Sequence, residues 1–218
     1  MTLTLDGSAA VRTVALARGG EVLASTILAG GRSTPWFRSI DELLQQAGLE
    51  RTAIQRLAVT LGPGSYTGIR GTLAVAQGWQ LARGTDVIGF GTAEACALTA
   101  LETGWRGRLV LLIDAQRGEY YVSEFDLDPG RHPVPQPLQP LRIASRVEVE
   151  AVLTSAVHCA GPDDAARSFG GTTLPPAASA LAKLAHLHGP VATNRPHLEP
   201  IYLRATTFVK APPSRVVP

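Results

Sequence analysis

The sequence predicts an α/β protein built from two related halves. Apolar, strand-like runs alternate along the chain with segments of helical periodicity. The opening strand, residues 3–5, ends in Asp6 and leads into a hairpin. A later strand, residues 108–113, ends in Asp114 and turns at Gly118 into another strand. The second pattern echoes the first, which favours a duplicated α/β unit that begins with a β-hairpin.

Composition narrows the class of protein further. The chain has 218 residues, of which 45% are hydrophobic and 17% charged, as is typical of a compact globular protein. A net charge of +2 predicts no broad electrostatic field for nucleic acid. No apolar run approaches the roughly twenty residues of a membrane span, and the first residues lack the basic start of a signal peptide. The isolated Cys96 and Cys159 form no redox or zinc motif, so we expect a cytoplasmic protein without a metal.

The first half opens with strands and a clear helix. A turn at Gly19-Gly20 predicts a hairpin. Apolar residues recur at helical spacing over residues 35–47, where Thr34 is the expected N-cap and Gly48 ends the helix. Residues 56–61 then read as a short buried strand.

A second helix is expected over residues 67–83, before Gly84. Interior glycines each cost about 1 kcal/mol relative to alanine, yet this helix contains several. Its small residues fall on one stripe: Gly71, Ala74, Gly78 and Ala82. Such a stripe lets another helix approach closely, either inside the fold or in a partner.

The pattern restarts near residue 104, which divides the chain into an N-terminal half, 1–103, and a C-terminal half, 104–218. Five prolines between residues 129 and 140 predict an irregular surface loop. Helices are expected over residues 147–157 and 177–188, followed by a short strand at 201–203. The last segment is expected to pack back on the first half.

The glycine-rich loop before the second helix fits no phosphate or nucleophile motif. A P-loop needs Lys directly after its last Gly, but here the first basic residue, Arg70, stands two residues after Gly68. A dinucleotide fingerprint needs its third Gly at position 67, which is Thr67. Pro63 occupies the position of the first Gly of a nucleophile elbow around Ser65. Ser65 and Thr67 are therefore interpreted as helix caps.

Asp6 and Asp114 leave two interpretations open. In a duplicated fold they could face a nucleotide–magnesium complex across a cleft, or each could cap a turn through its side chain. The five histidines show no spacing of four residues, so no metal site is predicted. Trp36 and Trp79 suit either a core or a partner surface.

Three blocks together resemble one family, the TsaB proteins of bacterial tRNA threonylcarbamoylation. They are LGPGSYTGIR at 61–70, IDAQRGEYY at 113–121 and EPIYLR at 199–204. Their order and the chain length also match. The sequence departs from the family pattern at Gly7, which follows Asp6 in place of Thr, at Gly71-Thr72 after Arg70, and at Trp79.

The resemblance implies an actin-like (ASKHA, ribonuclease H-like) fold of two α/β halves. It further implies a non-catalytic subunit that binds and activates the transferase TsaD, in a complex that also contains the ATPase TsaE. The chain would meet tRNA only indirectly, would form homodimers through the helices that otherwise meet TsaD, and would have no cofactor of its own. ATP or ADP would be held at an interface of the complex.

The family resemblance also implies two groups of site residues. The partner interface would comprise Trp36, Ile40, Arg70, Gly71, Ala74, Gln77 and Gly78. A degenerate nucleotide site would comprise Asp6, Gly7 and Ser8. The alternative is a catalytic member of the same fold, either a metal-dependent transferase or a small-molecule kinase. The first would need a histidine pair, which is absent from the sequence. The second would need an intact phosphate loop and a base near a substrate pocket, for which Asp6-Gly7-Ser8 is the one ambiguous candidate.

Overall fold

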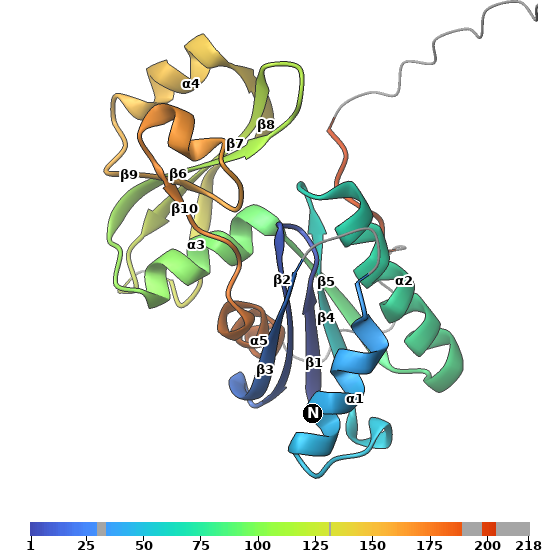
Figure 1. Ribbon diagram of the computed structural model, residues 1–218. Helices are drawn as coiled ribbons and strands as arrows, with labels where there is room; N and C mark the ends of the chain where they lie inside the picture. Colours follow the sequence, from blue (N-terminus) through green and yellow to red (C-terminus); the bar gives the residue numbers. More distant parts are fainter. Residues whose placement is uncertain (30–33, 131, 189–197, 204–218) are drawn as a thin grey trace, which may run out of the picture.

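Two five-stranded sheets, each with its own helices, make up the chain (Figure 1). This architecture comes from a computed structural model, which describes residues 1–29, 34–130, 132–188 and 198–203. Among the helices so described, none has both the length and the apolar character needed to cross a bilayer.

The first sheet lies entirely in the N-terminal part of the chain. Its strands are β1 (Thr2–Asp6), β2 (Val11–Arg18), β3 (Glu21–Ala29), β4 (Arg56–Gly62) and β5 (Asp86–Gly91). The order is β3-β2-β1-β4-β5, with β2 antiparallel to its neighbours and β4 parallel to both β1 and β5. The hairpin predicted at Gly19-Gly20 joins β2 to β3, and both glycines adopt the positive φ of a tight turn, 58° and 88°.

The second sheet repeats this topology. Its strands are β6 (Gly107–Asp114), β7 (Glu119–Leu127), β8 (Gln136–Ser145), β9 (His158–Gly161) and β10 (Thr172–Thr173). The order β10-β9-β6-β7-β8 again places the opening strand in the centre, a hairpin on one side and parallel strands on the other. The predicted α/β fold of two related halves is therefore confirmed.

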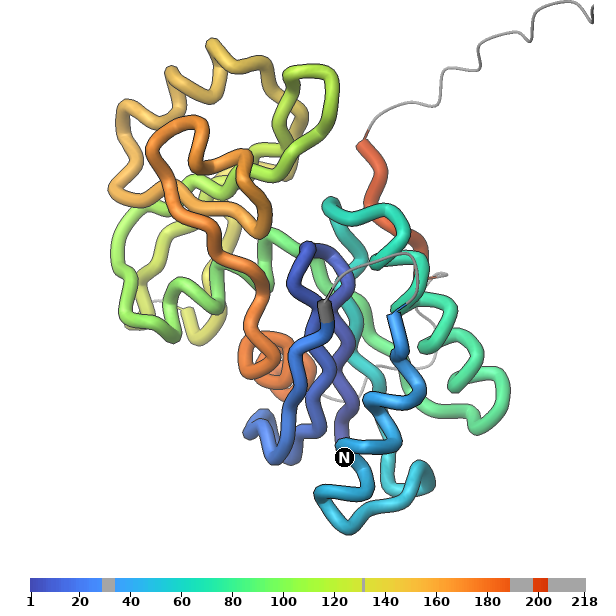
Figure 2. Tube along the Cα trace, viewed as in Figure 1, coloured from blue at the N-terminus to red at the C-terminus, as the bar shows by residue number. Residues whose placement is uncertain are grey.

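Helices cover both faces of the first sheet. The helices on this sheet are α1 (Trp36–Gln46), α2 (Tyr66–Arg83), α3 (Thr92–Glu102) and α5 (Ala178–Leu187), with a 3₁₀ turn at Arg51–Ala53. The remaining helix, α4 (Arg146–Leu153), and the 3₁₀ turn at Ala166–Phe169 pack on the second sheet. On β1, Leu3 and Leu5 point to the core that α1 and α2 cover. The opposite face carries α5 (Figure 2), and α3 shares one core with β5, β6 and α5.

A late segment of the chain, helix α5, packs on the sheet formed by the first strands. α5 contacts every strand of the first sheet, although it follows the second sheet in the chain. Arg56 on β4 donates a hydrogen bond of 2.8 Å to the Ala185 carbonyl oxygen and forms a 2.7 Å ion pair with Asp86. Leu181 and Leu184 on α5 are fully buried in the core that includes α3.

The structure corrects the interpretation of the proline-rich segment in its later part, whereas the described residues 129–130 and 132–135 are irregular as predicted. Residues 136–145 form β8 rather than an irregular loop, with Pro137 opposite Phe125 of β7. β8 lies at the edge of its sheet, where a residue without an N–H removes no ladder hydrogen bond on the open side.

The predicted cap of the first helix is also wrong. α1 begins at Trp36 with Pro35 at the N-cap position, and no side chain caps it. The Thr34 hydroxyl instead accepts a hydrogen bond from Arg12.

We expect the division at residue 103 to separate segments that do not both fold alone. Expressed as residues 104–218, the C-terminal fragment would expose Leu181 and Leu184, because α3 and the first sheet belong to the other fragment. This fragment should show no cooperative thermal transition by circular dichroism, whereas the full chain should. Two fragments that each melt cooperatively would contradict this prediction.

Candidate partner interface

The turn after β1 sits directly on the start of α2. Gly7 and Gly68 face each other so closely that a Cβ on either would overlap the other's carbonyl oxygen. The Ser65 amide donates a 2.7 Å hydrogen bond to the Ser8 carbonyl oxygen, beside Gly64, where a Cβ would also overlap that oxygen. Glycine is required at these positions because two backbones occupy the space of a side chain.

The predicted cap at Ser65 is confirmed. Its hydroxyl accepts a hydrogen bond from the Gly68 amide at 3.4 Å, and Ser65 is the N-cap of α2. Thr67 is not a cap but lies exposed within the first turn.

Asp6, Gly7 and Ser8, the residues of the predicted degenerate nucleotide site, are all buried. The Asp6 carboxylate is fully inaccessible, and its Oδ1 accepts hydrogen bonds from the Ser8 amide (2.9 Å), the Ser8 hydroxyl (2.7 Å) and the Thr60 hydroxyl (2.7 Å). Oδ2 has no partner among the described residues. Burial raises the pKa of Asp6 despite these hydrogen bonds. The hydrogen bonds of the carboxyl group thus fix the turn at Ser8 and join it to Thr60 on β4.

Asp114 has the corresponding position in the second half but is exposed. Its Oδ1 accepts a 2.7 Å hydrogen bond from the Gln116 amide, and its own amide donates to Asp163 Oδ2 at 3.0 Å. Burial raises the pKa of Asp163. Both acids that end a central strand therefore make the turn-capping bonds of the second interpretation above.

The outer face of α2 is exposed along its whole length. One row of exposed residues follows the helical repeat of three to four positions: Thr67, Arg70, Ala74, Gln77, Gly78 and Leu81. We call these six residues the α2 outer face. Leu81 is 91% exposed, and on α1 Phe37 is 52% exposed. Two helices thus present small and apolar side chains to solvent, a composition suited to close helix packing.

The structure divides the residues predicted for the partner interface. Arg70, Ala74, Gln77 and Gly78 belong to the α2 outer face. Trp36 and Ile40 instead lie in the core of the N-terminal half, with 7% and 0% of their surface exposed. Trp79 is also buried there.

Gly71 explains why Trp36 turns inward. A Cβ on Gly71 would lie 3.0 Å from the Trp36 indole nitrogen, so the ring of α1 packs over this glycine. Part of the small-residue stripe is therefore used inside the fold. Gly78 is different, because a Cβ there would meet nothing within 4 Å.

The C-terminal segment lies against the start of α2 (Figures 1 and 2). The Ile201 amide donates a 2.8 Å hydrogen bond to the Leu61 carbonyl oxygen, although residues 201–203 form no strand, contrary to the prediction. Tyr202 lies 6.2 Å from Tyr66, ring centre to ring centre. The first and third family blocks thus meet in space, with Arg204 outside the described residues.

Sequence reasoning missed four exposed residues of this region: Phe37, Tyr66, Leu81 and Tyr202. A signal for Phe37 and Leu81 was present, because both are apolar and out of phase with the buried side of their helix. The Tyr66–Tyr202 contact had no local signal.

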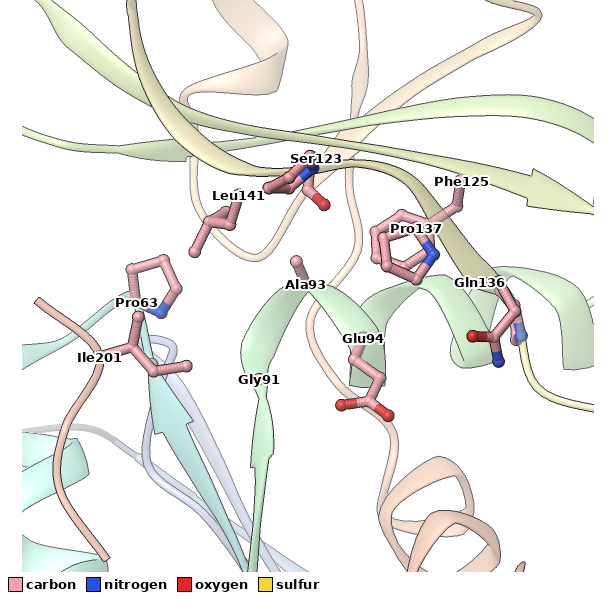
Figure 3. Close-up of a pocket in the computed structure, with 13 residues that line it drawn as sticks. Pro63, Gly91, Ala93, Glu94, Ser123, Phe125, Gln136, Pro137, Leu141 and Ile201 are labelled. Carbon is pink, nitrogen blue, oxygen red and sulfur yellow. The ribbon is translucent and has the colours of Figure 1, made fainter. Parts of the chain in front are cut away.

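A cavity of about 300 Å³ opens between the two halves (Figure 3). Its walls are mainly apolar and include Pro63, Phe125, Leu141 and Ile201. Glu94 on α3, Ser123 on β7 and Gln136 on β8 are the polar residues that line it. Within the part of the chain that the structure describes, no three His, Cys, Asp or Glu side chains are grouped as metal ligands would be.

Comparisons with known proteins bear on the family. A sequence model of the TsaD family, tRNA N6-adenosine threonylcarbamoyltransferase, matches residues 36–131. The tRNA threonylcarbamoyladenosine biosynthesis protein TsaB of Escherichia coli is 32% identical over 127 residues, 58% of this chain and 55% of that protein. TsaB of Haemophilus influenzae is 35% identical over 123 residues, 56% of this chain and 52% of that protein. The chain spans about half the length of these curated relatives, and the resemblance to TsaB is confirmed.

Solved structures extend the likeness in fold to nearly the whole chain. YeaZ from Pseudomonas aeruginosa has a TM-score of 0.74 at 23% identity, over 93% of this chain and 99% of that one. A second Pseudomonas aeruginosa structure, described as similar to peptidase YeaZ, has a TM-score of 0.75 at 24% identity with the same coverage.

Two glycines of α2 should respond oppositely to alanine. Gly68→Ala should destabilise the chain by about 2 kcal/mol or more, because the Cβ would overlap the Gly7 carbonyl oxygen. Gly78→Ala should stabilise it by about 0.5–1 kcal/mol, because the space is open and alanine is the better helix former. Urea unfolding measures both, and equal effects would contradict the packing described for the start of α2.

The buried Asp6 should make stability depend on pH. The pKa of Asp6 in the folded state is raised above the value of 3.8 that it has when solvated. Between these two pKa values the folded state keeps the carboxyl proton while the unfolded state has released it. The contribution of Asp6 to stability is therefore largest below pH 3.8 and falls as pH rises towards the folded-state pKa. Asp6→Asn does not titrate, so its stability relative to wild type should increase from pH 4 upwards. Urea unfolding of both proteins between pH 4 and pH 8 tests this, and a difference that stays constant or declines would contradict it.

Proposed function

We propose that this chain is a non-catalytic subunit that binds and activates TsaD in the threonylcarbamoylation of the tRNA adenosine next to the anticodon. The observation that carries the proposal is the identity of 32% and 35% with two TsaB proteins, whose names state that biosynthesis. TsaD, TsaE and a second copy of the chain are its protein partners, and it contacts tRNA only through them. We place it in the cytoplasm, with ATP or ADP bound at an interface of the complex.

The state of Asp6 supports a subunit without chemistry of its own. Its carboxyl group is fully buried and hydrogen-bonded to Ser8 and Thr60. Gly7 and Gly68 close the approach from the start of α2. Substrate phosphates could reach this carboxyl group only if the turn separated from the helix.

A catalytic transferase is the second candidate, because the TsaD family model matches residues 36–131. That match runs from α1 to the residues after β7 and includes Asp114. Asp114, however, binds the Gln116 amide and side chain at 2.7 and 2.6 Å. Both acids at the ends of central strands serve turns, which favours the subunit.

The α2 outer face supports a helix-to-helix contact with TsaD. Ala74 and Gly78 are small and exposed, so a partner helix can approach the α2 backbone. Leu81 on α2 and Phe37 on α1 supply exposed apolar area for such a contact. In this proposal a homodimer uses the same face, so TsaD and a second copy compete for it.

Bulk or charge on the α2 outer face should block the complex. Ala74→Arg and Gly78→Leu should each weaken binding to TsaD from the same organism by about tenfold or more, measured by isothermal titration calorimetry. Folding should persist, because both positions are exposed. Gln80→Arg is the matched control: it places the same side chain on an exposed position of α2 outside this face.

Two results would count against this surface. Normal binding by both variants would show that TsaD binds elsewhere. A melting temperature that falls together with the affinity would show that Ala74 and Gly78 belong to the core.

A further inference from the structure

One cation on the α2 outer face, Arg70, is held in place by Tyr66, four residues earlier on the same helix, and by Tyr202, 132 positions later in the chain. Its guanidinium carbon lies 4.3 Å from the centre of the Tyr66 ring, and its Nε donates a 3.3 Å hydrogen bond to the Tyr202 hydroxyl. Tyr66 and Tyr202 are themselves 56% and 51% exposed. The guanidinium is therefore oriented at the surface by the Tyr66 ring and the Tyr202 hydroxyl rather than buried by them.

The charge of Arg70 is not neutralised by any carboxylate of the described residues. Arginines of the neighbouring segments do have acidic partners: Arg38 pairs with Glu42 at 2.9 Å and Arg51 with Asp41 at 2.6 Å. Arg70 forms no such pair among the described residues, and its hydrogen bond to Tyr202 uses Nε. Its Nη groups remain available for a bidentate acceptor.

We propose that Arg70 binds a carboxylate of the protein that docks on the α2 outer face, with Tyr66 and Tyr202 as positioning residues. The inference rests on the proposed function, which makes that protein TsaD. Stacking and the Tyr202 hydrogen bond restrict the long side chain before binding, so less rotamer freedom is lost when the carboxylate arrives.

The surroundings favour a carboxylate over the phosphates of RNA. Binding of a phosphate backbone depends on several cations along one path. The α2 outer face offers one, because its other members, Thr67, Ala74, Gln77, Gly78 and Leu81, are uncharged. A single planar fork beside apolar and small residues matches one acidic side chain on a partner helix.

The proposal gives the C-terminal segment a role in recognition. Ile201 is tied to Leu61 by a backbone hydrogen bond, and the next residue supplies the hydroxyl that orients Arg70. Residues 201 and 202 thus connect the end of β4 to the partner surface.

The first test compares the affinities of Arg70 variants for TsaD at 50 and 300 mM salt. Arg70→Gln should weaken binding about 10- to 100-fold at the lower salt concentration and should reduce the salt dependence of the dissociation constant. Arg70→Lys should recover part of the affinity, because it retains the charge without the planar fork. Arg83→Gln is the control, an exposed arginine on the same helix outside the α2 outer face, and should change affinity less than about twofold.

The second test isolates the positioning by Tyr202. Tyr202→Phe removes the hydroxyl but keeps the ring, and should weaken binding about three- to tenfold without lowering the melting temperature. In an Arg70→Gln background the same change should cost nothing further, because the group it positions is gone. Additive losses would show that Tyr202 acts independently of Arg70 and would overturn its positioning role.

The outcomes separate the two proposals. A wild-type chain that does not bind TsaD overturns the proposed function and this inference with it. A wild-type chain that binds TsaD while Arg70→Gln binds equally well, with the same salt dependence, overturns this inference alone. A loss confined to tRNA binding by Arg70→Gln would assign the cation to a phosphate and would also overturn it.

Discussion

The contact between the turn after β1 and the first turn of α2 sets the arrangement of the N-terminal half. Gly7 and Gly68 bring two backbones within a distance that no side chain permits, and Ser65 joins the helix to Ser8. The contact encloses Asp6, whose carboxyl group then binds Ser8 and Thr60 rather than solvent. It also fixes the rotation of α2, so that one side of the helix enters the core and the other remains exposed.

The C-terminal half packs on the face of the first sheet opposite α1 and α2. Its sheet repeats the strand order of the first, but α5 leaves it and covers the first sheet on the face opposite α1 and α2. α3 contributes to a core that includes residues of both sheets. The α2 outer face, the proposed partner surface, therefore belongs to a helix whose sheet is packed on both sides, and we expect it to change little on binding. The C-terminal residues 201 and 202 add the only described contact that reaches this surface from the far end of the chain.

Local chemistry made much of the fold predictable. The Gly19-Gly20 turn, the Ser65 cap and Gly84 after α2 each depend on residues next to one another in sequence, and each prediction is confirmed. Residues 86–102 were missed because β5 and α3 are buried on several sides and carry no clear alternation. The residues left Trp36 open between core and partner surface, because periodicity separates apolar from polar faces but cannot distinguish a helix's own core from a partner. The family resemblance placed it at the interface, whereas the structure buries it. The Arg70–Tyr202 contact joins residues 132 positions apart, beyond any local pattern.

The central claim is that the chain acts by binding a catalytic partner rather than by chemistry of its own. Reconstitution tests it most directly. TsaD and TsaE from the same organism are supplied with tRNA and a threonylcarbamoyl donor, with or without this chain, and modified adenosine is measured. The account predicts modification that depends on the chain together with TsaD, and none from the chain alone. Modification by the chain without TsaD, or equal modification when the chain is left out, would contradict it.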